Sequence, residues 1–240
     1  MTVKWLFGKK KPAEPPPVAK DIPKDDDRRG PVPPPPRTAH APGVEICKFG
    51  AIPSRQLMRM DGGHAGFFLE GEEGKGSVPV LLVLSRGDAG GGGGAGASPA
   101  AAAPPPPSPG DVLLFSPSSS FEEISRTSLL PHRHIGRDGV AGAAFPGITG
   151  LRVLARLPEA GLAVLRLGPP PGARWVFRGV RAFAVFSGRL AAFDGDDVKE
   201  VRAGSLARVG DPTATLYLEA CNEAALAVAL AAHDFIAALG

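Results

Sequence analysis

The sequence predicts an all-β fold of two tandem β units, with an extended proline-rich arm before them and a short C-terminal helix. Three observations predict it. Short segments that alternate apolar and polar side chains recur from residue 44 onward, as half-buried strands do. In the second half of the chain, turn sequences rich in Gly, Pro and Asp separate these segments roughly every 8–12 residues. The 32 glycines and 27 prolines gather mainly in residues 1–43 and 88–109, which leaves enough apolar sequence for a core.

Residues 1–43 are expected to form an extended basic arm. Proline fixes φ and lacks an N–H donor, so a segment this rich in proline adopts a polyproline-like conformation without a core. The arm holds nine Lys or Arg and five acidic residues, whereas the rest of the chain holds 18 and 19. Because the folded part is close to neutral, we expect no nucleic-acid binding.

The start of the arm is a candidate docking segment, in which an apolar triplet lies beside three lysines. Its residues are Trp5, Leu6, Phe7, Lys9, Lys10 and Lys11. Such a cluster can dock in the groove of a partner protein or touch an anionic membrane surface peripherally. The alternative is a flexible tail in which the apolar cluster is fortuitous.

The first β unit is expected at residues 44–145. The low-complexity segment 88–109 interrupts this unit and is predicted to be a surface insertion, because its composition cannot form a core. The predicted strands are 44–49, 56–60, 66–70, 78–85 and 111–115. Residues 121–130 fit a short helix or an edge strand, and residues 131–145 read as a glycine-rich connection.

The second β unit is expected at residues 146–240. The predicted strands are 151–157, 162–167, 182–186, 189–193, 198–201, 205–209, 213–219 and 225–231. The alanine content of residues 223–239 also fits a helix. The alternation in the first half of that stretch favours a strand, so only residues 233–239 are predicted to be helical.

Residues 162–232 resemble a cupin, a small double-stranded β-helix barrel or jelly roll. The resemblance rests on four segments in order: PPPGARW at 169–175, FAVFSGR at 183–189, DGD at 194–196 and AGS at 203–205. It implies that the second unit is such a barrel.

A fainter version of the same pattern occurs in the first unit, in residues 81–87 and 109–117. Two tandem matches imply either a bicupin-like arrangement or one barrel with an elaborated partner sheet.

The cupin resemblance implies a metal position that this sequence does not rebuild. Many cupin enzymes hold a metal with an HxH pair, a glutamate and a later histidine. Aligned on Gly188, these positions hold Trp175, Phe177, Arg181 and Thr215. Indole, phenyl and guanidinium groups do not ligate divalent metals, and a cation at residue 181 would repel one. We therefore expect no metal, no cofactor and no catalytic residue at this position.

Two other sets of residues carry potential chemistry. His132 and His134 would share one face of a strand and could bind a metal with help from Asp138, but their exposed connection assures no third ligand. Cys47 and Cys221 are too few for a disulfide framework and are expected to be inert, buried thiols. The low number of cysteines and the lack of a secretory signal predict an intracellular, reducing location. No apolar run reaches roughly 20 residues, so no transmembrane segment is expected.

These observations favour a structural or accessory subunit of a larger assembly that is not an enzyme and that contacts other subunits through its arm and barrel surface. The predicted pocket residues are Arg174, Trp175, Phe177, Arg178, Arg181 and Thr215. Trp175, Phe177 and Arg181 would fill the former metal cavity or line an interface pocket. One alternative is a cupin-type enzyme or a sensor that binds a small anion with Arg174, Arg178 and Arg181 at the barrel mouth. A further alternative is a membrane-surface adaptor anchored by its N-terminus.

Overall fold

The computed structural model describes most of the chain beyond residue 40. The described residues are 41–60, 64–69, 78–85, 107–117, 119, 121–126, 133–139, 142–221 and 223–240. All of them belong to one structural unit, residues 36–240. Of the expected arm and of the expected insertion, only the last three residues of each are described. The docking segment at residues 5–11 lies outside the described residues.

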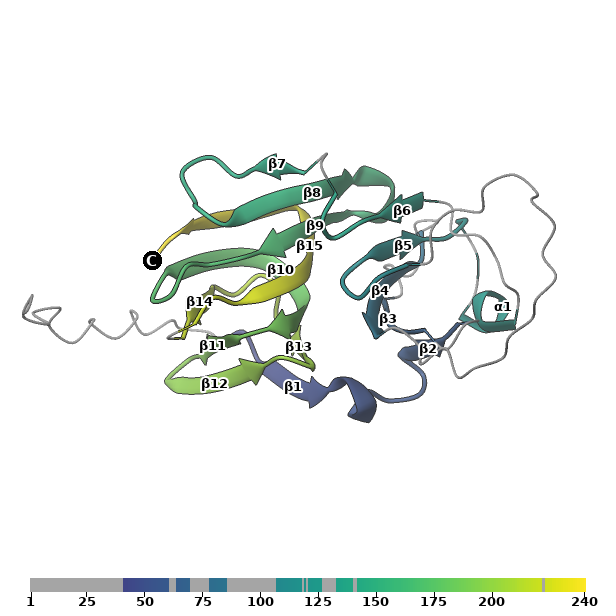
Figure 1. Ribbon diagram of the computed structural model, residues 1–240, viewed down its shortest axis with the longest axis horizontal. Helices are drawn as coiled ribbons and strands as arrows, with labels where there is room; N and C mark the ends of the chain where they lie inside the picture. The colour runs from purple at the N-terminus through teal and green to yellow at the C-terminus, as the bar shows by residue number, and fades with distance from the viewer. Residues whose placement is uncertain are drawn as a thin grey trace, which may run out of the picture. The chain divides into compact units, whose positions relative to one another are not determined.

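Within the described part of the chain, ten strands form one antiparallel sheet, which confirms the predicted all-β, cupin-like fold class (Figure 1). Eight strands follow the order β12-β11-β14-β10-β15-β9-β8-β7, and β13 pairs with β10 and with β1. Their bounds are β1 Val44–Lys48, β7 Ala143–Ala144, β8 Leu151–Leu157, β9 Leu162–Leu167, β10 Arg174–Ser187, β11 Arg189–Asp194, β12 Asp197–Arg202, β13 Ser205–Val209, β14 Leu216–Ala220 and β15 Leu226–Leu239. A 3-10 turn, Pro158–Ala160, joins β8 to β9.

The long strand β10 joins the two halves of this sheet. Its first part, Arg174–Phe177, pairs with β14, and a later part, Ala182–Val185, pairs with β13. Strand β15 follows the other edge of β10, with register shifts on both sides of Val180. Between the two parts, Gly179 has a φ of +93°, and a Cβ there would lie 3.2 Å from the backbone of Phe235. A glycine therefore lets β10 change direction while β15 packs closely against it.

The two halves of the large sheet enclose one apolar core. Alternate residues of β9, β10, β14 and β15 point into it, as the period of two in a strand requires. The largest of its side chains are Trp175, Phe177 and Phe183, and none of them is more than 1% exposed. Alanines on β15, at positions 227, 229 and 231, face these aromatic rings from the same core cluster and leave room for them.

A second antiparallel sheet, of five strands in the described residues, has the order β2-β3-β4-β5-β6. Its strands are β2 Leu57–Arg59, β3 Ala65–Leu69, β4 Val80–Ser85, β5 Val112–Leu114 and β6 Arg133–Ile135. A 3-10 turn, Phe49–Ala51, follows β1, and helix α1, Phe121–Arg126, follows β5. The sequence left two arrangements open, a bicupin-like pair and one barrel with an elaborated partner sheet. The described strands β2 to β6 of the first unit form this single sheet.

The outer face of the large sheet packs against this second sheet. Ala182 and Ala184 of β10 share one core cluster with Phe67 and Leu82 of the second sheet. Since Phe183 between the two alanines points into the first core, one strand serves two cores with its two faces. The opposite face of the second sheet carries a third cluster, which includes Ile124 of α1.

The predicted helix at residues 233–239 is wrong. Strand β15 continues to Leu239, and its last residues pair with β10 at Trp175↔Leu239 and Phe177↔Ala237. Phe235 is 7% exposed and lies in the core of the large sheet. Pairing with β10 and burial of Phe235 outweigh the weak helix preference of the alanines.

Other segments differ from expectation in extent rather than in type. Strand β10 begins at Arg174, eight residues before the predicted start at 182, because the first part of β10 finds β14 as a partner. The expected connection at 131–145 contains the short strands β6 and β7. Strand β1, expected in the first unit, pairs with β13 of the large sheet. Residues 121–126, for which a helix and an edge strand were both open, form α1.

Candidate functional site

The interior of the large sheet is packed with side chains at the position where the cupin resemblance implies a metal. Trp175 and Phe177 are 1% and 0% exposed, and their rings meet edge to face with centroids 6.0 Å apart. Thr215, at the later histidine position, accepts a hydrogen bond from Nε of Arg178 at 3.1 Å. In the described part of the chain, no three His, Cys, Asp or Glu side chains lie close enough to hold a metal ion.

The three arginines predicted at one barrel mouth do not converge. Arg174 forms a two-pronged ion pair with Glu219, at 3.0 and 2.6 Å, and its guanidinium lies 5.0 Å from the ring centre of Phe193. Arg178 is exposed and bonds to Thr215. Arg181 instead lines a cleft between the two sheets. Arg174 and Arg178 thus make their contacts within the large sheet.

The cleft at Arg181 has a volume of about 550 Å³ and is lined by residues of both sheets. Its lining comprises Arg55, Gln56, Phe67, Phe68, Leu69, Arg181, Ala182, Arg208, Val209 and Pro212. We call it the inter-sheet cleft. Three of these side chains are arginines, and no acidic side chain is among them.

Strand pairing explains how the large sheet brings two of these arginines together. Arg208 of β13 pairs with Ala182 of β10, the residue next to Arg181. On β13, Leu206 points toward the second sheet and Ala207 toward the inner core, so alternation places Arg208 on the side of the second sheet. The core between the sheets therefore ends in a basic rim. Arg55 reaches the same rim from the segment before β2.

One of the cleft arginines, Arg208, has only an exposed ion-pair partner. The nearest carboxylate recorded for Arg208 is that of Glu45, at 3.9 Å, and the two side chains are 43% and 79% exposed. Such an exposed pair contributes little. Among the described residues, no ion pair of Arg55 is recorded. Sequence reasoning found Arg181 but missed Arg55 and Arg208, since only the pairing of β10 with β13 brings them together.

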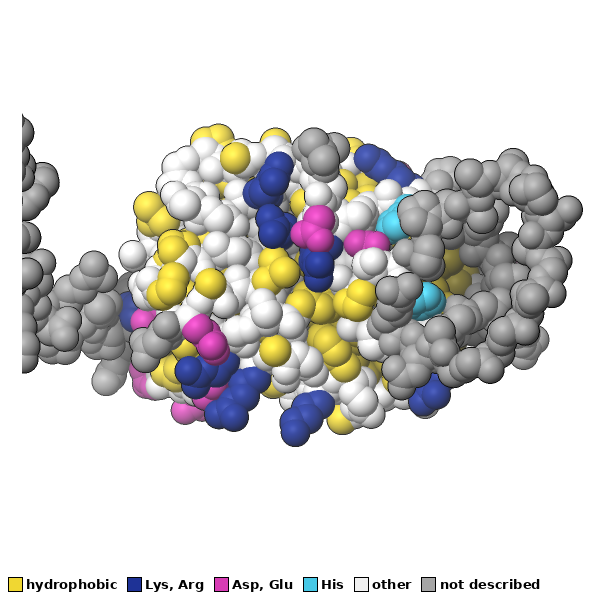
Figure 2. Space-filling view, viewed as in Figure 1, with side chains coloured by type: hydrophobic (Ala, Val, Ile, Leu, Met, Phe, Trp, Pro, Cys, Tyr) yellow, Lys and Arg dark blue, Asp and Glu magenta, His cyan; other side chains and the backbone are white. Residues whose placement is uncertain are grey.

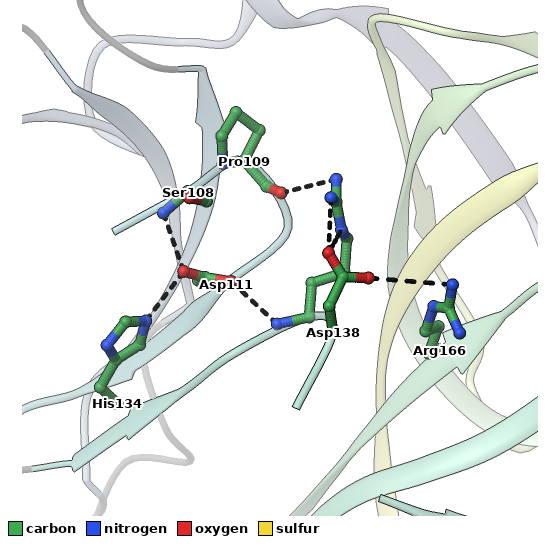
Figure 3. Close-up of polar contacts among 7 residues, drawn as sticks. Ser108, Pro109, Asp111, His134, Asp138 and Arg166 are labelled. Carbon is green, nitrogen blue, oxygen red and sulfur yellow. Dashed lines mark hydrogen bonds and ion pairs between the residues drawn. The ribbon is translucent and has the colours of Figure 1, made fainter. Parts of the chain in front are cut away.

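A second polar cluster links the ends of β5 and β6 (Figure 3). The carboxylate of Asp111, a buried residue, accepts hydrogen bonds from the backbone N–H groups of Ser108 and Arg137 and contacts Nε2 of His134, all at 2.8 Å. Asp138 does not join His134, as the metal hypothesis required, but binds Arg137 at 2.8 Å.

The other member of the HxH pair, His132, lies outside the described residues. Through its three contacts, Asp111 holds the turn after β6 against the loop before β5. Both cysteines are free thiols, and burial raises the pKa of Cys47.

On the face seen in Figure 2, some Lys and Arg side chains lie beside Asp or Glu, and others lie apart from them among uncharged areas. No helix in the described part of the chain is both long enough and apolar enough to cross a membrane.

Comparison with known proteins gives structural matches only. No protein-family model matches the chain, and no curated protein sequence matches it. Pumpkin pro-11S globulin matches 53% of this chain with 18% identity and a TM-score of 0.34, and the chain spans 37% of that protein. Salicylate 1,2-dioxygenase from Pseudaminobacter salicylatoxidans matches 85% of this chain and 90% of its own length, with 10% identity and a TM-score of 0.39. These proteins have the cupin fold.

One expectation from the sequence is corrected by this comparison. The chain was expected not to be an enzyme, because the metal ligands of the cupin pattern are missing. A structure that matches 85% of the chain is that of an enzyme, a salicylate 1,2-dioxygenase, which contradicts the expectation. Missing metal ligands at one position therefore do not decide whether this chain has an activity.

Proposed function

We propose that this protein binds a small organic anion in the inter-sheet cleft. The observation that carries the proposal is the convergence of Arg55, Arg181 and Arg208 on one cleft of about 550 Å³. Clefts of roughly 300–1,000 Å³ suit small ligands. The proposal takes up the anionic-ligand alternative, with Arg181 kept from the sequence and with Arg55 and Arg208 in place of Arg174 and Arg178.

The chemistry of the cleft supports an anion rather than a neutral ligand. A guanidinium presents parallel N–H donors that match the two oxygens of a carboxylate or the oxygens of a phosphate. Three such groups around one cleft, whose lining contains no acidic side chain, favour a negatively charged occupant. Partial exclusion of water by the flanking sheets strengthens these interactions.

The remaining walls support a ligand with an apolar part. Leu69, Ala182, Val209 and Pro212 line the cleft beside the arginines. Apolar atoms that leave water against such walls contribute about 25 cal/mol per Å² of buried area. An organic anion such as an aryl phosphate or an aryl carboxylate satisfies both halves of the lining. Inorganic phosphate satisfies only the basic half.

Calorimetric titration of the full chain with phenyl phosphate, benzoate and inorganic phosphate at constant ionic strength tests the proposal. We expect saturable binding of phenyl phosphate and benzoate in this cleft, and benzoate, which has no phosphate group, should bind at one site per chain. In this cleft, phenyl phosphate should bind more tightly than inorganic phosphate. The double variant Arg55→Gln/Arg208→Gln should weaken binding of the organic anion at least tenfold, because it removes two guanidinium groups and their two charges.

The matched control is Arg202→Gln, which removes one exposed arginine whose recorded ion pair is with Glu200, away from the cleft lining. It should change the affinity less than twofold. Equal losses in the control and in the double variant would show a general charge effect and contradict the proposal. Absence of saturable binding for both organic anions would do the same.

A further inference from the structure

A like-charge pair stands at the opposite flank of the large sheet. Arg152 of β8 and Arg166 of β9 are directly paired in the strand register, so their side chains share one face. Like charges in this position oppose each other and are destabilising. The register of β8 and β9 therefore places two guanidinium groups next to each other, although their charges repel.

Three guanidiniums lie in this region, and one carboxylate, that of Asp138, contacts two of them. Asp138 lies 2.8 Å from Nη2 of Arg137 and 3.8 Å from Nη2 of Arg166, and Figure 3 shows Arg166 reaching from β9 toward it. Arg152 donates to the carbonyl oxygen of Gly142, which carries no net charge. The hydrogen bond from Arg137, opposed in part by burial, lowers the pKa of Asp138, and the charges of Arg137 and Arg166 lower it further. Among the described residues, no second carboxylate is recorded in an ion pair with these arginines.

The two paired arginines line a cleft of about 680 Å³ together with the loop from Ala144 to Leu151. Nε of Arg166 is buried there and has no hydrogen-bond acceptor. A buried donor without an acceptor is destabilising, so an acceptor at this position would stabilise the protein. The loop is fixed closely against β9: a Cβ on Gly150 would lie 2.0 Å from the carbonyl oxygen of Gly168. Arg152 and Arg166 therefore lie beside a loop that is packed closely against the end of β9.

We propose that Arg152 and Arg166 form a second anion site, which binds a phosphate group, either free or at the end of a small phosphate ester. A phosphate brings two negative charges and several acceptor oxygens, enough to offset the paired guanidiniums and to accept from more than one of their N–H groups. This site is independent of the inter-sheet cleft, because the two share no lining residue.

The test is calorimetric titration of the full chain with inorganic phosphate and with glycerol 3-phosphate, at constant ionic strength. The double variant Arg152→Gln/Arg166→Gln should weaken binding of at least one probe tenfold or more. Arg152→Lys/Arg166→Lys keeps both charges but loses the planar fork, and it should give an intermediate affinity. If the Gln variant does not fold, as judged by circular dichroism, the Lys variant alone still carries the test.

Comparison of the two clefts separates this inference from the proposed function. Arg55→Gln/Arg208→Gln should lose phenyl phosphate at the inter-sheet cleft and keep phosphate at the second site. Phosphate binding that disappears in that variant, and survives substitution of Arg152 and Arg166, would overturn the second site while leaving the first intact. Absence of binding for both probes would overturn it as well.

Discussion

The two faces of strand β10 differ in what they contact. On the inner face, Trp175, Phe177 and Phe183 are almost fully buried and fill the interior of the large sheet. On the outer face, small alanines pack against the second sheet, and Arg181 opens onto a cleft at the rim of that contact. The cupin-like interior thus serves as a core in this protein, while three arginines line the cleft where the two sheets meet. The anion site proposed for the inter-sheet cleft lies at that contact.

The largest expected effect is on the inner face. Phe177→Ala removes a side chain that is fully buried and contacts Trp175 edge to face. Such a deletion costs about 3–5 kcal/mol, because the cavity left by an aromatic ring in a closed core collapses only in part. Urea unfolding at pH 7 measures it.

If instead the interior were a ligand cavity rather than a core, Phe177→Ala would cost less than about 1 kcal/mol. That outcome would remove the contrast between the two faces.

A smaller effect is expected between the sheets. Ala184 is fully buried in the core cluster that the two sheets share. Ala184→Leu adds three carbon atoms where the sheets approach each other and should cost about 1–3 kcal/mol through overpacking. Because the substitution pushes the sheets apart, it should also weaken anion binding in the inter-sheet cleft.

Thermal unfolding and phenyl phosphate titration of the same variant check both effects. A stable variant with unchanged affinity would show that the two sheets are not tightly packed on each other at this point.

Local patterns predicted the strands well because each strand carries its own alternation. The segments at 151–157 and 162–167 were expected from sequence and are β8 and β9. The C-terminal half of β15 was missed, since its alanines fit a helix locally and only the pairing with β10 decides otherwise. The start of β10 at Arg174 was also missed, because only its pairing with β14 defines it.

The candidate site was less predictable than the fold. Arg181 could be singled out by its place in the cupin pattern, but Arg55 and Arg208 come from segments more than 150 residues apart in the chain. Nothing local marks an arginine as a cleft residue, and long-range pairing decides it. The same holds for Arg152 and Arg166, whose opposition follows from the β8–β9 register.

The edge of the large sheet gives a third test, which depends on pH. Asp194, at the end of β11, accepts backbone hydrogen bonds from Gly43 at 2.8 Å and from Val44 at 3.0 Å, and it pairs with Lys199. Burial by itself would raise the pKa of Asp194, but the bonds from Lys199, Gly43 and Val44 outweigh it and lower that pKa. A carboxyl whose pKa is lowered by folding stabilises the fold at pH values above its unfolded-state pKa. This contribution is lost as the pH falls through the lowered pKa of the folded state.

Asp194→Asn should therefore cost about 1–2 kcal/mol at pH 7 through weaker, uncharged hydrogen bonds. The difference between the variant and the natural protein should begin to shrink below about pH 4, where the unfolded carboxyl gains its proton, and should continue to shrink through the lowered pKa of the folded protein. Unfolding curves at pH 7 and pH 3 measure both values. A difference that stays constant or grows toward low pH would show that the charge of Asp194 is not what holds Gly43 and Val44.

The smallest effect is expected at Ile236, which supplies the outward counterpart to Phe177. Its Cα pairs with Arg178, one position from the Phe177↔Ala237 pair, so both variants perturb the same stretch of the β10–β15 ladder. Ile236 is 60% exposed, whereas Phe177 is 0% exposed. Ile236→Ala should change the stability by no more than about 0.5 kcal/mol, the usual range for surface substitutions. Urea unfolding under the conditions used for Phe177→Ala makes the two values directly comparable. A loss at Ile236 that approaches the loss at Phe177 would mean that the outer side of this ladder is covered in solution, and that the two faces of β10 differ less than their exposures indicate.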